Sequence, residues 1–171
     1  IGLASTTGVG AAILHVFNHA LMKGALFLAL GAVAYRIGAV TLRDFAGLGR
    51  RMPWTMAAIA IGGLSLIGVP PTAGFVSKWY LVLATLEQNL WPIAVLILIG
   101  SLLALVYVWR LIEAAYFGTA AADAPKVSEA PASMLIPIWI LVAANLYFGI
   151  NTDLSVGAAM QAATMLMGAG E

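Results

Sequence analysis

Three side chains that can exchange protons, those of His15, His19 and Lys23, lie in the largely apolar stretch of residues 11–30. Steps of four residues drift by only about 40° around an α-helix, so the three side chains lie along one helical face. At about 1.5 Å of rise per residue the row covers about 12 Å, and its neighbours are about 6 Å apart. One bridging water can link groups at that separation. The spacing therefore predicts a path for protons along one face of a membrane helix.

Such a row could also have a purely structural role, because polar side chains in membranes hold helices together through hydrogen bonds. Ionisable groups are costly in lipid, where each must be paired, hydrated or kept neutral. A single buried histidine would favour the structural interpretation. Two histidines and a lysine in strict register favour the proton path instead.

A fourth ionisable group, Lys78, follows the middle of a segment that cannot cross the membrane as one continuous helix. Residues 54–87 would measure roughly 50 Å as a single helix, whereas the hydrocarbon core is about 30 Å thick. Two adjacent prolines lack N–H donors and displace the preceding residue from helical geometry. We expect one discontinuous helix with Lys78 about 10 Å beyond the break, still inside the membrane. The residues of the break are Gly68, Pro70, Pro71 and Gly74.

Structural alternatives exist for this break and for a charged pair further along the chain. A proline kink alone is common in membrane helices, but a kink followed within two turns by Lys78 favours an ion site.

Arg110 and Glu113 form an i, i+3 pair near the end of a later span. An interfacial ion pair with a snorkelling arginine is the favoured interpretation of that pair. The alternative is a link in a charged chain that leads to the cytoplasm.

The composition predicts an integral membrane protein. Only 9% of the 171 residues are charged, whereas soluble domains carry about 25% charged residues. The net charge of +1 gives no indication of a nucleic-acid partner. The absence of cysteine excludes thiolate metal sites, Fe–S clusters and disulfides, and we predict neither a metal nor a cofactor.

Hydropathy predicts an all-α, polytopic transmembrane bundle with one proline-broken helix. The expected spans cover residues 9–35, 54–87 with the break at 68–71, 92–117 and 132–150. Residues 151–171 are rich in alanine, methionine and glycine, and fit either a short surface helix or a frayed tail.

The orientation in the membrane follows from the connection of residues 36–53, which has a single acidic residue, Asp44. By the positive-inside rule this connection is cytoplasmic, and residues 87–91 then lie outside. Because the first residue is Ile and no signal peptide precedes the first span, we interpret the sequence as the C-terminal part of a longer protein or as an incomplete gene model. The arginines that set this orientation are Arg36, Arg43, Arg50 and Arg51.

Three of these segments resemble the superfamily of antiporter-like membrane proteins. Residues 15–27, HVFNHALMKGALF, resemble its H-x-x-x-H-A-x-x-K-x-x-L-F helix. Residues 42–53, LRDFAGLGRRMP, resemble its cytoplasmic loop, and residues 68–78, GVPPTAGFVSK, resemble its G-x-P-P-x-x-G-F-x-x-K broken helix. The superfamily includes the large subunits of Mrp-type multisubunit Na⁺/H⁺ antiporters and the proton-pumping subunits of respiratory complex I.

The resemblance implies an inverted-repeat fold, of which this chain is the second half and contains one half-channel. It implies that Lys23 is the central relay lysine and that His15 and His19 belong to a water-filled axis. It also implies that Lys78 is the ion-gating residue and faces the outside exit. The first repeat, with the family's Glu–Lys pair, is absent, so we do not expect a complete transport path within these residues alone.

The predicted function is that of a proton-translocating subunit of a multisubunit Na⁺/H⁺ antiporter, resembling a D-type Mrp subunit. We expect a multi-pass protein of a bacterial inner membrane, with the other subunits of its complex as partners and H⁺ and Na⁺ as transported ions. The alternative is a proton-pumping subunit of NADH-quinone oxidoreductase (complex I) or of a related membrane-bound hydrogenase. A purely structural membrane anchor is less favoured. A redox enzyme in its own right lacks support, because no haem-ligand pattern, nucleotide motif or cysteine occurs.

Overall fold

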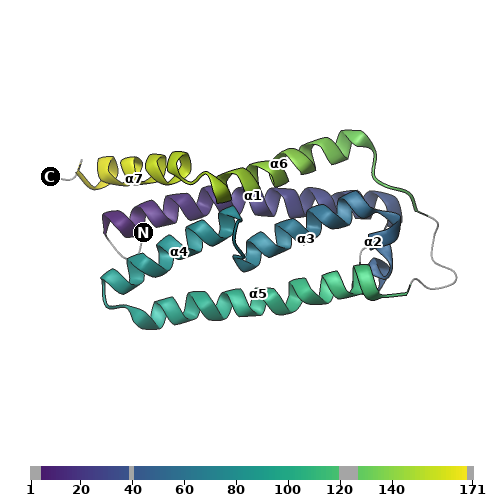
Figure 1. Ribbon diagram of the computed structural model, residues 1–171, viewed down its shortest axis with the longest axis horizontal. Helices are drawn as coiled ribbons and strands as arrows, with labels where there is room; N and C mark the ends of the chain where they lie inside the picture. Colours follow the sequence, from purple (N-terminus) through teal and green to yellow (C-terminus); the bar gives the residue numbers. More distant parts are fainter. Residues whose placement is uncertain (1–4, 39–40, 120–126, 169–171) are drawn as a thin grey trace.

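The computed structural model describes residues 5–38, 41–119 and 127–168. This described part is a helical bundle, and α1 (Thr6–Ile37) runs along most of its length (Figure 1). Ser5 begins α1, because its side chain accepts a hydrogen bond from Gly8 N at 3.0 Å. Gly38, with a φ of 89°, ends it. The helix that carries the two histidines and Lys23 is therefore the axis on which the other helices pack.

The discontinuous helix expected from the two prolines is present as α3 (Pro53–Ile67) and α4 (Ala73–Glu87). Each part has 15 residues, or about 22 Å, and neither could cross a hydrocarbon core of about 30 Å alone. Pro53 stands in the first turn of α3, where its missing N–H is not needed. Gly68 ends α3 with a φ of 93°, a conformation that glycine adopts without steric cost. Helix α5 (Trp91–Phe117) then runs back along both parts (Figure 1).

Helices α6 (Ala132–Ile150) and α7 (Asp153–Gly168) follow one another along the other side of α1 (Figure 1). The sequence was compatible with either a short helix or a frayed tail after residue 150, and the structure shows a helix over residues 153–168. It packs on the first half of α1, where Ala159 joins Leu14 in a buried cluster. Within the described residues, α1, α5 and α6 are long and apolar enough to cross a membrane, by length and composition.

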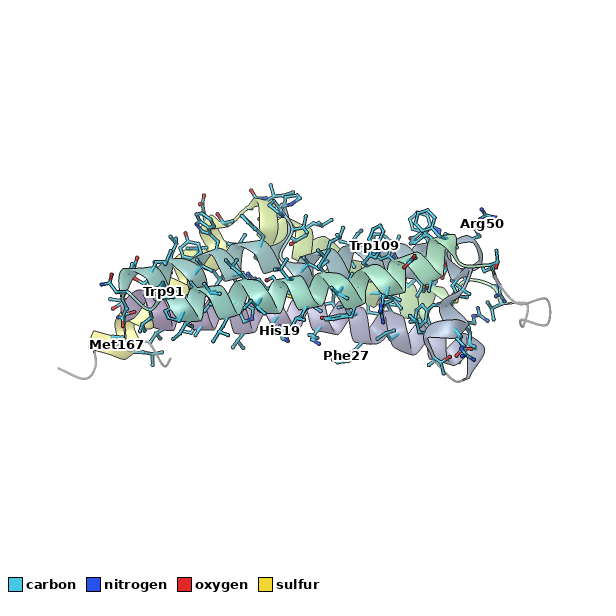
Figure 2. All side chains as sticks on the ribbon, turned by 90° about the horizontal axis from the view of Figure 1, so that it is seen from below. His19, Phe27, Arg50, Trp91, Trp109 and Met167 are labelled. Carbon is cyan, nitrogen blue, oxygen red and sulfur yellow. The ribbon has the colours of Figure 1, made fainter. Side chains whose placement is uncertain are left out.

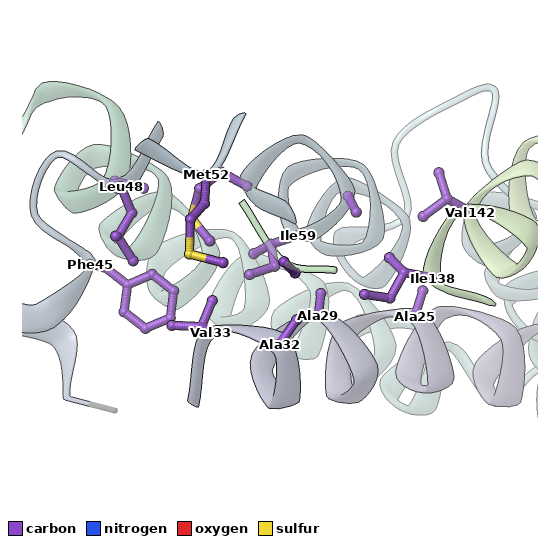
Figure 3. Close-up of a cluster of buried hydrophobic side chains, with 14 residues drawn as sticks. Ala25, Ala29, Ala32, Val33, Phe45, Leu48, Met52, Ile59, Ile138 and Val142 are labelled. Carbon is purple, nitrogen blue, oxygen red and sulfur yellow. The ribbon is translucent and has the colours of Figure 1, made fainter. Parts of the chain in front are cut away.

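Small residues let α1 approach its neighbours closely. Ala25, Ala29 and Ala32 are fully buried on one face of α1 and pack with Ile59 of α3 and Ile138 of α6 (Figure 3). Close approach of helix backbones through small residues is a main source of helix association in lipid. This face is turned by about a third of a turn from the histidine and lysine row. The core therefore fixes the direction in which that row points.

Asp44 organises the arginine-rich connection at one end of the bundle, which includes the short helices η1 (Leu42–Phe45) and α2 (Leu48–Arg51). Its carboxylate accepts hydrogen bonds from Thr41 Oγ1 at 2.8 Å and from Thr41 N at 2.6 Å. These two bonds hold the pKa of Asp44 below its ordinary value, since both stabilise the ionised carboxylate. Asp44 thus acts as a local cap for η1.

Glu129 ties three segments together at the same end of the bundle. Its carboxylate accepts hydrogen bonds from Trp54 N at 2.8 Å and from Thr55 Oγ1 at 2.5 Å, at the start of α3. A negative charge at a helix N-terminus is favourable, because it pairs with unbonded amides and with the helix dipole. Arg36 Nη2 of α1 donates to the backbone carbonyl of Glu129. The segment before α6 is thereby joined to α1 and α3.

The orientation of the bundle is testable by labelling its two ends. Arg50 and Trp91 lie at opposite ends (Figure 2), and Leu42 and Gln88 are exposed positions near them. By the positive-inside rule, the excess of arginine predicts that the end with Leu42 lies in the cytoplasm. In an otherwise cysteine-free full-length protein, an impermeant thiol reagent added from outside should modify Gln88→Cys and leave Leu42→Cys unmodified. The opposite labelling pattern would invert the orientation.

Candidate functional site

The predicted row lies along α1 as its spacing requires. His15, His19 and Lys23 are all half-buried, and the ring centroids of the two histidines are 5.5 Å apart. His19 and Phe27 lie along the same edge of α1 (Figure 2). The Lys23 ammonium is 5.5 Å from the centroid of the Phe27 ring, close enough for a cation–π contact.

One cavity of about 310 Å³ brings the predicted ionisable residues together. His15, His19 and Lys23 line it from α1, and Lys78 lines it from α4. Its remaining wall comes mainly from α5, which contributes Tyr107 and three small or apolar residues. Residues 55 positions apart in the sequence, Lys23 and Lys78, therefore line the same cavity. Their roles in ion movement remain predictions from the sequence.

Lys78 is held at the break by three hydrogen bonds. Its Nζ donates to Leu66 O at 2.7 Å, to Ile67 O at 2.9 Å and to Ser101 Oγ at 2.8 Å. An ammonium group has three N–H donors, and each finds an acceptor here. Two of the acceptors are carbonyls at the C-terminal end of α3, where the helix dipole is negative. The arrangement therefore suits the charged form of the lysine.

Side chains from neighbouring helices also satisfy the backbone amides that the break frees at the start of α4. Ala73 N donates to Asn145 Oδ1 at 3.3 Å, and Gly74 N donates to Ser65 Oγ at 3.1 Å. Gly74 is required for a close approach, because a Cβ there would stand 1.9 Å from Ser65 O. Irregular backbone at membrane depth is tolerated where such partners surround it.

A hydrogen bond links the row on α1 to the helix that carries Lys78. His15 Nδ1 and Ser77 Oγ are 3.0 Å apart, and Ser77 directly precedes Lys78. A hydroxyl both donates and accepts, so it can serve either tautomer of the histidine. Ser77 thus provides a polar contact between His15 and the second part of the broken helix.

Of the predicted pair Arg110 and Glu113, only Arg110 lines a cavity. Arg110 lines a second cavity of about 460 Å³, and Lys23, Leu66 and Tyr107 line both cavities. Glu113 is exposed and is not among the lining residues of either cavity. The second cavity extends from Lys23 toward the arginine-rich end of the bundle, since Arg110 lies in the last two turns of α5.

Sequence reasoning missed the neutral polar residues of this site. Asn18 and Asn145 bond to Ala73 beside the break, and Tyr107 lines the cavity. Ser77 bonds to His15, and Ser101 bonds to Lys78. Their only signal in the sequence is their occurrence within apolar spans, which is weak because serine often bonds its own helix. Among the described residues, no group of three or more His, Asp or Glu side chains is arranged to hold a metal ion.

Comparison with known proteins places the chain within a family. A family profile described as NADH:quinone oxidoreductase/Mrp antiporter, transmembrane, matches residues 1–104. The N subunit of NADH-quinone oxidoreductase from Desulforudis audaxviator is 44% identical over 76% of this chain and 28% of that protein. The D subunit of the Na(+)/H(+) antiporter from Alkalihalophilus pseudofirmus is 29% identical over 90% of this chain and 31% of that protein. The chain thus spans about a third or less of these relatives.

Solved structures share the fold. A chain of the Mrp complex from Dietzia sp. DQ12-45-1b superposes with a TM-score of 0.87 at 23% identity, covering 96% of this chain and 39% of that one. A chain of an archaeal membrane-bound sulfane sulfur reductase gives a TM-score of 0.77 at 38% identity, covering 84% of this chain and 24% of that one.

A broken helix packed on a long helix with half-buried ionisable residues is the fold of polytopic, antiporter-like membrane subunits. The profile match and the identities above assign the chain within that class. It belongs to the NADH:quinone oxidoreductase/Mrp antiporter transmembrane family.

Proposed function

We propose that this chain forms a proton-conducting half-channel in a membrane subunit of a multisubunit complex. The observation that carries the proposal is the cavity that His15, His19, Lys23 and Lys78 line together beside a broken helix. Two imidazoles and two amines around one cavity can pass protons to one another through water. Ionisable residues within a membrane mark ion pathways more often than they mark structural contacts.

In this proposal the proton path has two branches that meet at Lys23. One branch runs past Tyr107 and Arg110 through the second cavity toward the cytoplasmic end. The other runs from Lys23 past the histidines to Ser77 and Lys78. Lys78 acts as the gate, because loss of its proton would leave the carbonyls at the end of α3 without their charged donor.

The driving force comes from the rest of the complex, and the relatives suggest two candidates. The relative from Alkalihalophilus pseudofirmus is named as part of an Na(+)/H(+) antiporter, which supports exchange of Na⁺ for H⁺. The bacterial inner (plasma) membrane is the location that we propose for this exchange. The relative from Desulforudis audaxviator is named as part of a quinone oxidoreductase and shares a higher identity, 44%. Proton conduction coupled to electron transfer is therefore the second candidate, and the higher identity supports it.

Proton movement by the intact complex in sealed vesicles tests the proposal. Acidification or alkalinisation of the lumen would be followed with a pH-sensitive dye under two conditions. An imposed Na⁺ gradient should drive protons if the complex is an antiporter, whereas an electron donor with quinone should drive them if it is a redox pump. Failure of both drives in an intact, correctly oriented complex would contradict the proposal and favour the structural anchor.

A further inference from the structure

The connection between η1 and α2 packs closely on the last turn of α5. Gly47 donates its backbone N–H to a carbonyl of α5 at 3.2 Å. A Cβ at Gly49 would stand 2.7 Å from Cδ1 of Tyr116, so a larger residue there would push α2 away from α5. Arg50 and Arg51 follow directly in α2. This packing therefore holds two arginines beside the end of a long apolar helix.

A cavity of about 430 Å³ lies between α2 and this end of α5. Its volume is within the range of about 300–1,000 Å³ that is usual for ligand sites. Arg50 and Arg51 line it from α2, and Tyr116 and Thr119 line it from the other side. Among the described residues, no carboxylate lines this arginine cavity. Two positive charges without a counter-charge in the lining suit an anion.

Arginine narrows the chemistry of that anion. A guanidinium group is planar and presents five N–H donors in a fixed geometry. This geometry matches the paired oxygens of a phosphate or a carboxylate, which it binds through charge-assisted hydrogen bonds. The arginine cavity therefore selects an oxyanion, and its position in the membrane decides between the two kinds.

The arginine cavity lies at the depth of lipid headgroups. Helix α5 has 27 residues and measures about 40 Å, close to the thickness of a bilayer with its headgroup regions. Its last turn, which forms one wall of the cavity, is therefore at the interface. Tyr116 and Phe117 in that turn are exposed aromatic residues, which are typical of this level. The phosphates of phospholipids are the oxyanions concentrated at that depth.

An exposed apolar stripe on α5 leads away from the cavity into the membrane. Its members recur at steps of three, four and seven residues, so they share one helical face. The stripe consists of Leu98, Leu102, Leu105, Trp109 and Tyr116. Tyr116 belongs to both the stripe and the cavity, and Trp109 and Arg50 lie on the same edge of the bundle (Figure 2). Acyl chains fit such a stripe, whereas an acidic protein segment does not need it.

We propose that the arginine cavity binds the phosphate of an anionic phospholipid whose acyl chains lie along the stripe on α5. Arg50 and Arg51 supply the charge, and the aromatic residues at the end of α5 contact the upper part of the lipid. By the positive-inside rule this end faces the cytoplasm, where anionic lipids attract basic segments. The site is separate from the row on α1 and does not depend on proton conduction.

Lipid binding to the intact complex, depleted of lipid and studied by native mass spectrometry, tests the site. The affinity for phosphatidylglycerol should fall at least about tenfold in the double variant Arg50→Gln/Arg51→Gln, because hydrogen bonds between charged groups are among the strongest. The matched control is Arg43→Gln, which removes an exposed arginine at the same end that does not line the cavity. This control should bind phosphatidylglycerol as the wild type does. Equal affinities in the double variant and the control would overturn the site.

Two competitors distinguish a lipid from other sources of phosphate. Phosphatidylcholine has a compensating positive charge, and inorganic phosphate has no acyl chains. At equal concentration, neither should displace phosphatidylglycerol from the wild-type complex as well as phosphatidylglycerol itself does. Inorganic phosphate that competes equally well would show that the ligand is a free phosphate, and equal competition by phosphatidylcholine would show that the charge of the headgroup is not recognised. Either result would contradict the proposal.

A density map of the wild-type complex tests the same site without any variant. We expect headgroup density between Arg50 and Arg51 and acyl-chain density beside Trp109. A carboxylate of another protein segment in the arginine cavity, or protein packed along the stripe, would overturn the lipid assignment. This result holds whether or not the complex moves protons.

Discussion

The variant Lys78→Arg should lower proton transport by the intact complex at least about a hundredfold, the smaller end of the effects seen when a proton-transfer group is lost. Arginine keeps the positive charge, but it does not release its proton in proteins. The Lys78 ammonium donates to two carbonyls of α3 and to Ser101, so the site can hold a charge. A gate that must give up its proton should therefore fail while the complex still assembles.

Ser101→Ala provides the control for this experiment. It removes one of the three acceptors of Lys78 without adding volume or changing the titratable group. We expect a smaller loss of transport than in Lys78→Arg, with normal assembly. Wild-type transport in the arginine variant would show that Lys78 supplies only a fixed charge and would contradict its assignment as the gate.

The course of the helices could be predicted from the sequence because few physical rules control it. Apolar length set the spans, and the two prolines with Gly68 required a break where α3 ends in the structure. The four-residue spacing of the histidines and Lys23 placed them on one face, as the structure shows. These features depend on local geometry, which sequence patterns report well.

The partners of the break could not be predicted, because they depend on distant packing. Asn145 is separated from Ala73 by 72 residues, and nothing in its neighbourhood indicates that α6 reaches the break. Ser101 looks like any serine within an apolar span until α5 packs beside Lys78. The cap that Glu129 gives to α3 likewise joins segments 75 residues apart. Such contacts follow from the tertiary arrangement and leave no local periodicity.

Helix α7 is a second feature that the sequence did not decide. Residues 153–168 carry no strong amphipathic pattern, so the sequence left their state open. In the structure they form a helix whose small residues Ser155, Ala159 and Ala163 are buried. Small side chains permit close packing but do not by themselves specify a partner.

Proton transport by Lys23→Ala in the intact complex shows whether one connected path runs through the two cavities. Lys23 is the only amine that lines both cavities in the part of the chain that the structure describes. Its removal should therefore interrupt both branches and lower transport at least about a hundredfold. Assembly should be preserved, because the Lys23 side chain is half-buried and lies beside open cavity space.

The matched control is Arg43→Ala, which removes an exposed cation from η1 at the arginine-rich end of the bundle. This control should transport protons at close to the wild-type rate. We expect an assembled Lys23→Ala complex that has lost transport, beside a normal Arg43→Ala complex. Wild-type transport in Lys23→Ala, or loss of assembly with a normal rate in the complexes that remain, would contradict the relay path and favour a structural role for the row.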